Sequence, residues 1–131
     1  KESKLINTSY YPTEGLEDFQ KEFAGKVLTI EFEMFGQRFV AINAGDEFKF
    51  NEAVSFLVQC KDQNEIDYFW EKLSAVPESE QCGWCKDKYG LSWQVVPVEY
   101  FDLINSEDPK VRDKAMQNTL KQKKIILSEL K

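Results

Sequence analysis

The sequence predicts an α+β protein built from two related halves. Several short segments alternate apolar and polar residues with a period of two, as half-buried strands do. One segment repeats apolar residues at helical spacing. The pair Phe35-Gly36 recurs as Tyr89-Gly90, and an aromatic residue follows three positions after each glycine. Glycine permits a tight turn and the aromatic side chain anchors the strand, so this repeat predicts two hairpins of one design.

The first half is expected to contain three strands. Leu5 and Ile6 predict a short strand that leads into a polar loop. Residues 26–34 alternate with a period of two, which is typical of a strand with one buried face. Residues 38–43 follow the Phe35-Gly36 turn and predict its hairpin partner.

The second half is expected to contain three strands and a helix. Residues 53–60 are largely apolar and predict a central strand covered on both faces. Asp62 is a suitable N-cap, and Glu65 completes a capping box for the helix that follows. Residues 82–86 and 91–96 predict two strands joined by a tight turn. The apolar stripe of the helix is Ile66, Phe69, Trp70 and Leu73.

The C-terminal part is expected to be helical. Residues 100–104 predict a short helical turn. Asp108 and Pro109 then predict the start of a final helix that runs to about residue 122. Its inward positions are expected to be Val111, Ala115 and Leu120.

Composition excludes several classes of function. The 131 residues carry 17 basic and 23 acidic side chains, a net charge of −6, which argues against a nucleic-acid-binding surface. No apolar run approaches the ~20 residues of a membrane helix. The chain has no histidine, so histidine-based nucleophilic and zinc sites are excluded. Three cysteines without a secretory signal predict free thiols and a cytoplasmic location.

Charge is unevenly distributed. Residues 110–131 carry seven basic and two acidic side chains, whereas residues 1–109 carry ten and twenty-one. This basic tail is either a solvated helix face or a segment that docks on an acidic surface of its own chain or of a second subunit.

Three stretches resemble the PhnB-like proteins of the vicinal-oxygen-chelate superfamily, which also contains glyoxalase I and the bleomycin-resistance proteins. The resemblance implies paired β-α-β-β-β modules whose curved sheets enclose a small-molecule pocket, and it implies frequent dimerisation. Family members carry a strand and a helix before the segment that residues 1–5 resemble, so the first module is expected to lack its opening strand and helix. The stretches are residues 50–56 (FNEAVSF), 67–74 (DYFWEKLS) and 82–97, which contain CGW and DKYGLSWQVVP.

On this basis residues 1–131 are expected to form a single vicinal-oxygen-chelate-type domain. Residues 1–48 would be the remainder of module one, residues 49–100 module two, and residues 101–131 a helical C-terminal extension.

The resemblance also implies where a superfamily-type metal would be held. The ligand positions fall on Ser55, Gln94 and Val40, and the fourth falls on the absent opening strand. A hydroxyl, an amide and an isopropyl group do not make a metal-binding donor set, so we expect no catalytic metal and no cofactor.

Ser55 and Gln94 are instead expected to be polar anchors in an apolar ligand pocket. Strand alternation then adds Leu57 and Val96 from the same module, and Val40 and Ile42 from the other. The alternative is that Ser55 and Gln94 are satisfied polar residues of a sheet that binds no ligand.

Two further motifs have both a functional and a structural interpretation. Cys82 and Cys85 form a C-x-x-C, which could indicate redox chemistry or half of a zinc site. Their expected place in a hairpin strand favours packing. Glu31 and Glu33 face the same way and could divide acid and base roles, or could be solvated.

The sequence therefore predicts a homodimeric small-molecule-binding protein without a catalytic metal. A rival prediction is a metal-dependent lyase, isomerase or dioxygenase whose donors come from a missing N-terminal strand or a dimer partner. A third is an interaction domain that binds a protein. The family is often labelled a 3-demethylubiquinone-9 3-methyltransferase, but the chain has no G-x-G loop of a nucleoside-binding domain, and we expect no such activity.

Overall fold

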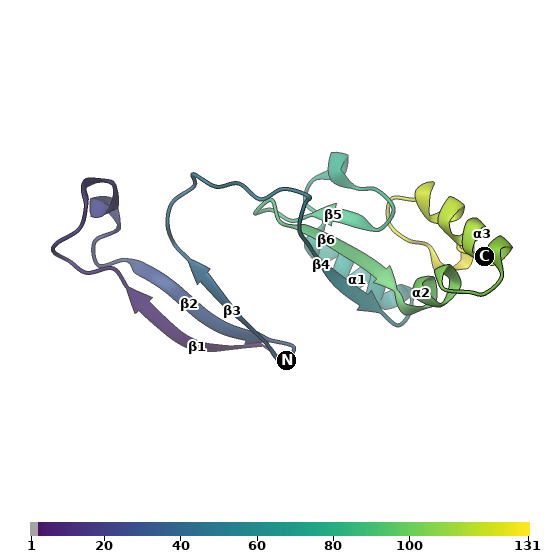
Figure 1. Ribbon diagram of the computed structural model, residues 1–131, viewed down its shortest axis with the longest axis horizontal. Coiled ribbons are helices and arrows are strands. Elements are labelled where there is room, and N and C mark those ends of the chain that lie inside the picture. The colour runs from purple at the N-terminus through teal and green to yellow at the C-terminus, as the bar shows by residue number, and fades with distance from the viewer. Residues whose placement is uncertain (1–2) are drawn as a thin grey trace. The chain divides into compact units, whose positions relative to one another are not determined.

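The computed structural model describes residues 3–131 and divides the chain into two compact units (Figure 1). Unit 1 extends to Phe48, and unit 2 comprises Lys49–Lys131. Each unit contains one three-stranded sheet, and the α-helices belong to unit 2. The predicted α+β class is confirmed, as is the order of three strands followed by strand, helix, strand and strand.

Unit 1 is an antiparallel sheet in the order β1-β2-β3. Its strands are β1 (Ser3–Tyr10), β2 (Val27–Met34) and β3 (Gln37–Ile42), and a 3₁₀ helix (Asp18–Phe23) lies between the first two. β1 is longer than the short strand predicted at Leu5 and Ile6. It pairs with β2 along nearly its whole length, and this backbone pairing extends the strand through polar residues that local sequence does not favour as strand.

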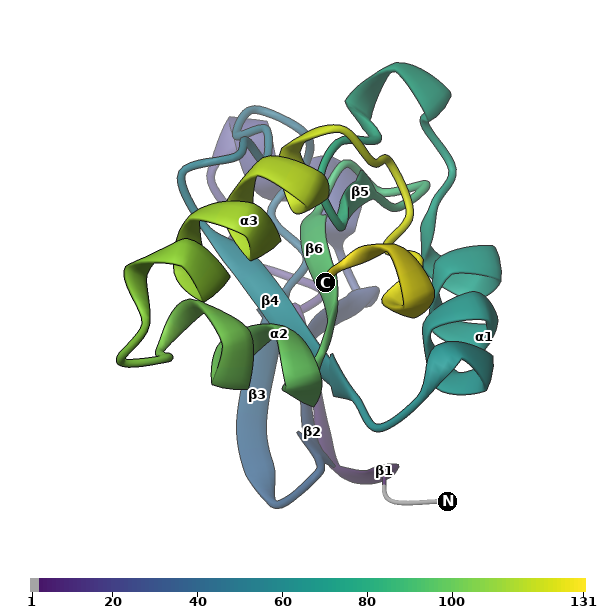
Figure 2. The same cartoon turned by 90° about the vertical axis from the view of Figure 1, so that its right-hand side faces the viewer.

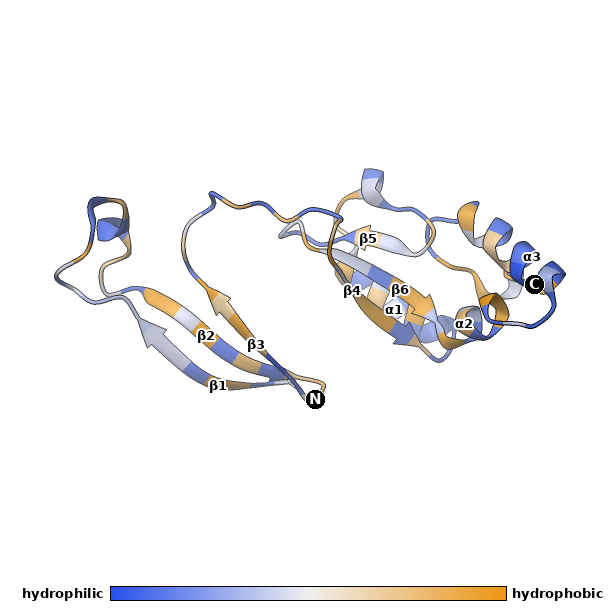
Figure 3. Ribbon diagram, viewed as in Figure 1, coloured by the Kyte–Doolittle hydropathy of each residue, from blue (hydrophilic) through white to orange (hydrophobic). Residues whose placement is uncertain are grey.

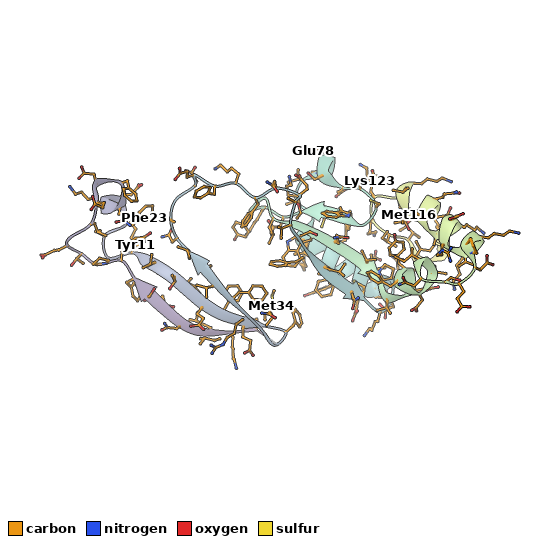
Figure 4. The ribbon with its side chains drawn as sticks, viewed as in Figure 1. Tyr11, Phe23, Met34, Glu78, Met116 and Lys123 are labelled. Carbon is orange, nitrogen blue, oxygen red and sulfur yellow. The ribbon has the colours of Figure 1, made fainter. Side chains whose placement is uncertain are left out.

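The loop of unit 1 is closed by aromatic and hydrogen-bond contacts. The rings of Tyr11 and Phe23 stack with their centroids 5.3 Å apart, as Figure 4 shows at the end of the sheet. The hydroxyl of Tyr11 donates to the carbonyl of Asn43 at 2.6 Å. Phe35 and Gly36 both have positive φ, as a two-residue hairpin turn between β2 and β3 requires.

The two faces of the unit 1 sheet differ in chemistry. Apolar and polar residues alternate along β2 (Figure 3). One face carries Glu31, paired with Arg38 at 3.1 Å, and Glu33, paired with Lys4 at 3.4 Å. The other is apolar, and among residues 3–48 no α-helix covers it. The side chains of this apolar face include Leu5, Ile30, Phe32, Met34 and Phe39.

Unit 2 contains a mixed sheet in the order β4-β6-β5. β4 (Ser55–Cys60) runs parallel to β6 (Ser92–Pro97), and β5 (Trp84–Lys86) runs antiparallel to β6. The prediction that residues 53–60 form a central strand was wrong, because β6 is the middle strand and β4 lies at an edge. The apolar character of β4 reflects one well-buried face, which includes Cys60, rather than a neighbour on each side.

α1 (Gln63–Leu73) covers that buried face and begins at the predicted cap. The carboxylate of Asp62 accepts a hydrogen bond from the backbone N–H of Glu65 at 2.9 Å. The carboxylate of Glu65 in turn accepts from the N–H of Lys61 at 2.9 Å, so two free donors at the helix start are satisfied. The fully buried core residues are Cys60, Ile66, Cys85, Val95, Ile125 and Leu130.

The C-terminal part contains α2 (Val98–Ile104), α3 (Pro109–Leu120) and a 3₁₀ helix (Leu127–Glu129). Asp108 caps α3 as predicted, by accepting from the N–H of Lys110 at 2.9 Å. Ala115 is buried as predicted, but Leu120 is exposed and Thr119 takes the inward position. Thr119 lies four residues after Ala115, as the period of a helix requires, whereas Leu120 lies five residues after it and so turns outward.

The last residues return to α1 and complete the core. The side-chain amide of Gln63 donates to the carbonyl of Ile125 at 3.1 Å and accepts from the N–H of Leu127 at 2.9 Å. Figure 2 shows this C-terminal segment beside α1. Lys124 pairs with Asp67, and Lys131 pairs with Glu99, both at 2.6 Å. Part of the basic tail therefore docks on acidic residues of its own unit.

No helix among the residues that the structure describes is long and apolar enough to cross a membrane.

Candidate functional site

The parallel pairing of β4 with β6 brings the two predicted polar anchors together. Ser55 lies opposite Ser92, and Leu57 lies opposite Gln94, so all four side chains share one face of the sheet. From this position the side-chain amide of Gln94 donates a hydrogen bond to Oγ of Ser55 at 2.9 Å. The face is the opposite of the one that α1 covers.

β5 adds a third strand to this face. Its Lys86 lies opposite Ser92 and its Trp84 lies opposite Gln94. Two rows of side chains therefore cross the sheet, each with one residue from β4, β6 and β5 in turn. The first row is Ser55, Ser92 and Lys86, and the second is Leu57, Gln94 and Trp84. We call these six residues the polar face of unit 2.

Accessibility differs along the polar face. Leu57 is 46% exposed, and Ser55, Gln94 and Trp84 are each partly exposed. Val96 shares the face two residues further along β6 but is only 4% exposed. Ser92, at the beginning of β6, is only 1% exposed as well, so the accessible part of the polar face is formed by Ser55, Leu57, Gln94, Trp84 and Lys86.

Val40 and Ile42, the other two predicted pocket residues, lie on β3 in unit 1 and are both exposed. Val40 pairs with Glu31, so its face of the sheet is the one that carries the charged side chains. The carboxylates of Glu31 and Glu33 each have a cation beside them, Arg38 and Lys4. Ion pairs of this kind are typical of a charged sheet surface, and they favour the interpretation that both glutamates face solvent.

Lys86 is a candidate site residue that the sequence did not single out. Its ammonium group pairs with the carboxylate of Glu52, which lies in the segment just before β4. The hydrogen bond from Lys86 holds the pKa of the Glu52 carboxyl below its usual range. Alternation along residues 84–86 places Lys86 on the face of Trp84. Only the register with β6 shows that this is also the face of Gln94.

The three cysteines are free, and they differ in environment. Cys60 and Cys85 are buried in the core, and burial raises the pKa of each thiol to about 11. Cys82 is partly exposed at a position with positive φ, and burial raises the pKa of its thiol as well. These shifts suppress the reactive thiolate form, which fits packing better than redox chemistry.

Other candidate sites are few among residues 3–131. No three His, Cys, Asp or Glu side chains there are close enough to hold a metal ion. An open hollow of about 420 Å³ lies in the loop between β1 and β2. It contains none of the predicted pocket residues, and its lining is Thr13, Glu14, Gly15, Leu16, Lys21 and Ala24.

Comparison with known proteins shows the family to which this chain belongs. Residues 1–96 match the sequence model of a family described as 3-demethylubiquinone-9 3-methyltransferase. A solved structure described as a putative 3-demethylubiquinone-9 3-methyltransferase, PhnB protein, from Bacillus cereus is 30% identical, with a TM-score of 0.54. The alignment covers 73% of this chain and 80% of that chain.

A search of the curated proteins gives no match. The similarity to the PhnB structure confirms the predicted glyoxalase-like fold class. Because the family model covers most of the sequence, the chain belongs to the PhnB-like family described as 3-demethylubiquinone-9 3-methyltransferase.

Proposed function

We propose that this protein binds a small molecule on the polar face of unit 2. The observation that carries the proposal is the hydrogen bond between Gln94 and Ser55, which holds an amide and a hydroxyl side by side next to the exposed side chain of Leu57. A few fixed polar groups among apolar side chains are the usual means by which a site orients a small ligand.

Three further residues remain predicted ligand contacts. Val96 continues the polar face along β6. Val40 and Ile42 hold the corresponding places in unit 1, since Val40 follows Gly36 by four residues, as Gln94 follows Gly90. We propose binding without a catalytic metal, because a serine hydroxyl and a glutamine amide are weak donors for a divalent cation.

We further propose that the protein is a cytoplasmic homodimer. The apolar face of the unit 1 sheet, with Leu5, Ile30 and Phe32, is the kind of surface that a second chain would cover. The free thiols of Cys60, Cys82 and Cys85 favour a reducing compartment.

A thermal-shift screen against a library of metabolites tests the binding proposal. A ligand of the polar face is expected to raise Tm by several degrees in the wild type. Gln94→Leu should remove that rise, and Gln117→Leu, which changes an exposed amide on α3, should keep it. An equal rise in Gln94→Leu would place the ligand elsewhere.

Measuring the metal content of the purified protein by elemental analysis distinguishes our proposal from the rival, metal-dependent function. A stoichiometric divalent metal would contradict our proposal and favour a metal-dependent lyase, isomerase or dioxygenase. Its absence, together with a rise in Tm from a metabolite, is the expected result.

A further inference from the structure

We propose that the ligand of the polar face is an anion, a small carboxylate or phosphate-type molecule whose charged group binds the ammonium of Lys86 in place of the Glu52 carboxylate. This inference rests on the proposed function and deepens it by naming the chemical class of the ligand.

The position of Lys86 is the first support. It ends the row that begins with Ser55 and crosses β6 at Ser92, so a cation lies on the same face as the two polar anchors. The side chain of Lys86 is only 22% exposed. Its charge is therefore less hydrated than that of an ordinary surface lysine, which strengthens its attraction for an anion.

Glu52 is the second support, because its carboxylate already occupies the place that we assign to the ligand. Its side chain is 62% exposed, and it belongs to a stretch before β4 that is neither helix nor strand. An ion pair with one well-exposed partner is weak, so releasing Glu52 costs little. The pair shows that Lys86 accepts a carboxylate, and the exposure of Glu52 is what lets a ligand carboxylate take that place.

The hydrogen-bond donors beside Lys86 complement an anion. The amide of Gln94 gives one N–H to Ser55, and the Ser55 hydroxyl keeps its own O–H to donate. A ligand anion beside Lys86 could accept from that O–H. Asp87, the next residue, is directed away from the polar face: its carboxylate accepts from the N–H of Tyr89 and from the indole N–H of Trp93, which packs against the core on the other face of the sheet.

Two probes of similar shape, one charged and one neutral, distinguish the effect of ligand charge on binding from the effect of contact area. We would titrate ¹⁵N-labelled full-length protein with benzoate and with benzamide, and follow the backbone and side-chain amide signals by NMR. Benzoate is expected to shift the signals of residues 55–57, 84–86 and 92–94, and to bind about tenfold more tightly than benzamide, since a hydrogen bond to a charged partner is stronger than a neutral one.

Charge variants at the ion pair test the mechanism. Lys86→Gln should remove the preference for benzoate, Lys86→Arg should keep it, and Lys88→Gln, in the neighbouring exposed turn, should leave it unchanged. Glu52→Gln removes the competing carboxylate and should raise the affinity for benzoate about two- to fivefold. Its matched control, Glu78→Gln, should have no effect, because Glu78 is exposed in a separate 3₁₀ helix.

Two results would overturn the inference. Equal binding of benzoate and benzamide at the polar face would refute a role for charge and leave the proposed function standing. Weaker benzoate binding in Glu52→Gln would show that Glu52 supports the ligand rather than competes with it. Failure of the proposed function would look different: in the metabolite screen, no ligand, charged or neutral, would lose its effect on Tm in Gln94→Leu.

Discussion

The sheets of the two units share a hairpin design but differ in how their apolar faces are covered. Phe39 follows Gly36 by three residues, as Trp93 follows Gly90. Trp93 packs against a core that α1 and the C-terminal segment complete. Phe39 stacks on Phe32 at 5.3 Å on a face that no α-helix of residues 3–48 covers.

The turn and the aromatic anchor therefore specify a hairpin, but its stability depends on what covers the apolar face. Ile66 on α1 is completely buried, whereas Ile30 on β2 is 38% exposed. Burial of apolar area is the main stabilising contribution in folding. We therefore expect the free energy of unfolding to depend much more on the core of unit 2 than on the sheet of unit 1.

Two isoleucine truncations should give the largest contrast. Ile66→Ala leaves a cavity in a closed core and should lower the free energy of unfolding by about 2–5 kcal/mol. In the dilute monomer Ile30→Ala should lower it by less than about 1 kcal/mol, since its side chain is already partly in water there, and by more at concentrations where the proposed homodimer covers this face. Urea denaturation followed by circular dichroism measures both. Equal losses in the dilute monomer would contradict the comparison between the two units.

A pair of glycine substitutions extends the comparison to the turns. Gly83 has φ +85°, and a Cβ there would lie 3.1 Å from both the Ile125 side chain and the Val95 carbonyl. Gly36 has φ +77° with no atom within 4 Å of such a Cβ. We expect Gly83→Ala to cost about 2–3 kcal/mol and Gly36→Ala about 1 kcal/mol, in the same urea assay. A larger loss of stability in Gly36→Ala than in Gly83→Ala would contradict the open space beside Gly36.

Helix capping gives a smaller contrast. Asp62 caps α1 through its side chain, whereas the 3₁₀ helix of unit 1 has no side-chain cap at Glu17. Asp62→Ala should cost about 1 kcal/mol, and Glu17→Ala should have almost no effect. Thermal melts of both variants check this prediction, and a similar Tm for Asp62→Ala and the wild type would refute the role of the cap.

Alkaline pH should destabilise unit 2 specifically, because all three cysteines lie in it. The buried thiols of Cys60 and Cys85 have their pKa raised to about 11 from an ordinary value near 9.0. Between these values the unfolded chain loses thiol protons that the folded chain retains, so the free energy of unfolding falls as pH rises. Urea midpoints at pH 8 and pH 10 measure the effect.

A thiol assay provides the control for that pH dependence. At pH 8 a disulfide reagent should modify Cys82 first and should reach Cys60 and Cys85 only after unfolding. Rapid reaction of all three thiols in the folded protein would contradict the burial of Cys60 and Cys85.

Local signals predicted the elements well, and long-range pairing was the part that sequence did not specify. The caps at Asp62 and Asp108 and the turn after Lys86 act within a few residues, so the sequence shows them directly. The place of β4 in its sheet depends on a partner more than thirty residues away. An apolar run cannot show whether a strand lies in the middle of a sheet or at an edge covered by a helix.

The same limit explains what was missed in the candidate site. Ser55 and Gln94 were singled out because the family resemblance places ligand positions on them. Lys86 was missed because its relation to Gln94 is a matter of register between strands, which alternation alone leaves undetermined.

Mapping a bound metabolite onto the chain is the measurement that tests the central claim most directly. With the strongest ligand from the thermal screen, the account predicts that amide NMR shifts concentrate at residues 55–57, 84–86 and 92–94. Shifts confined to residues 13–24, around the hollow in unit 1, would contradict it, because ligand binding would then be independent of the hydrogen-bonded pair Ser55 and Gln94.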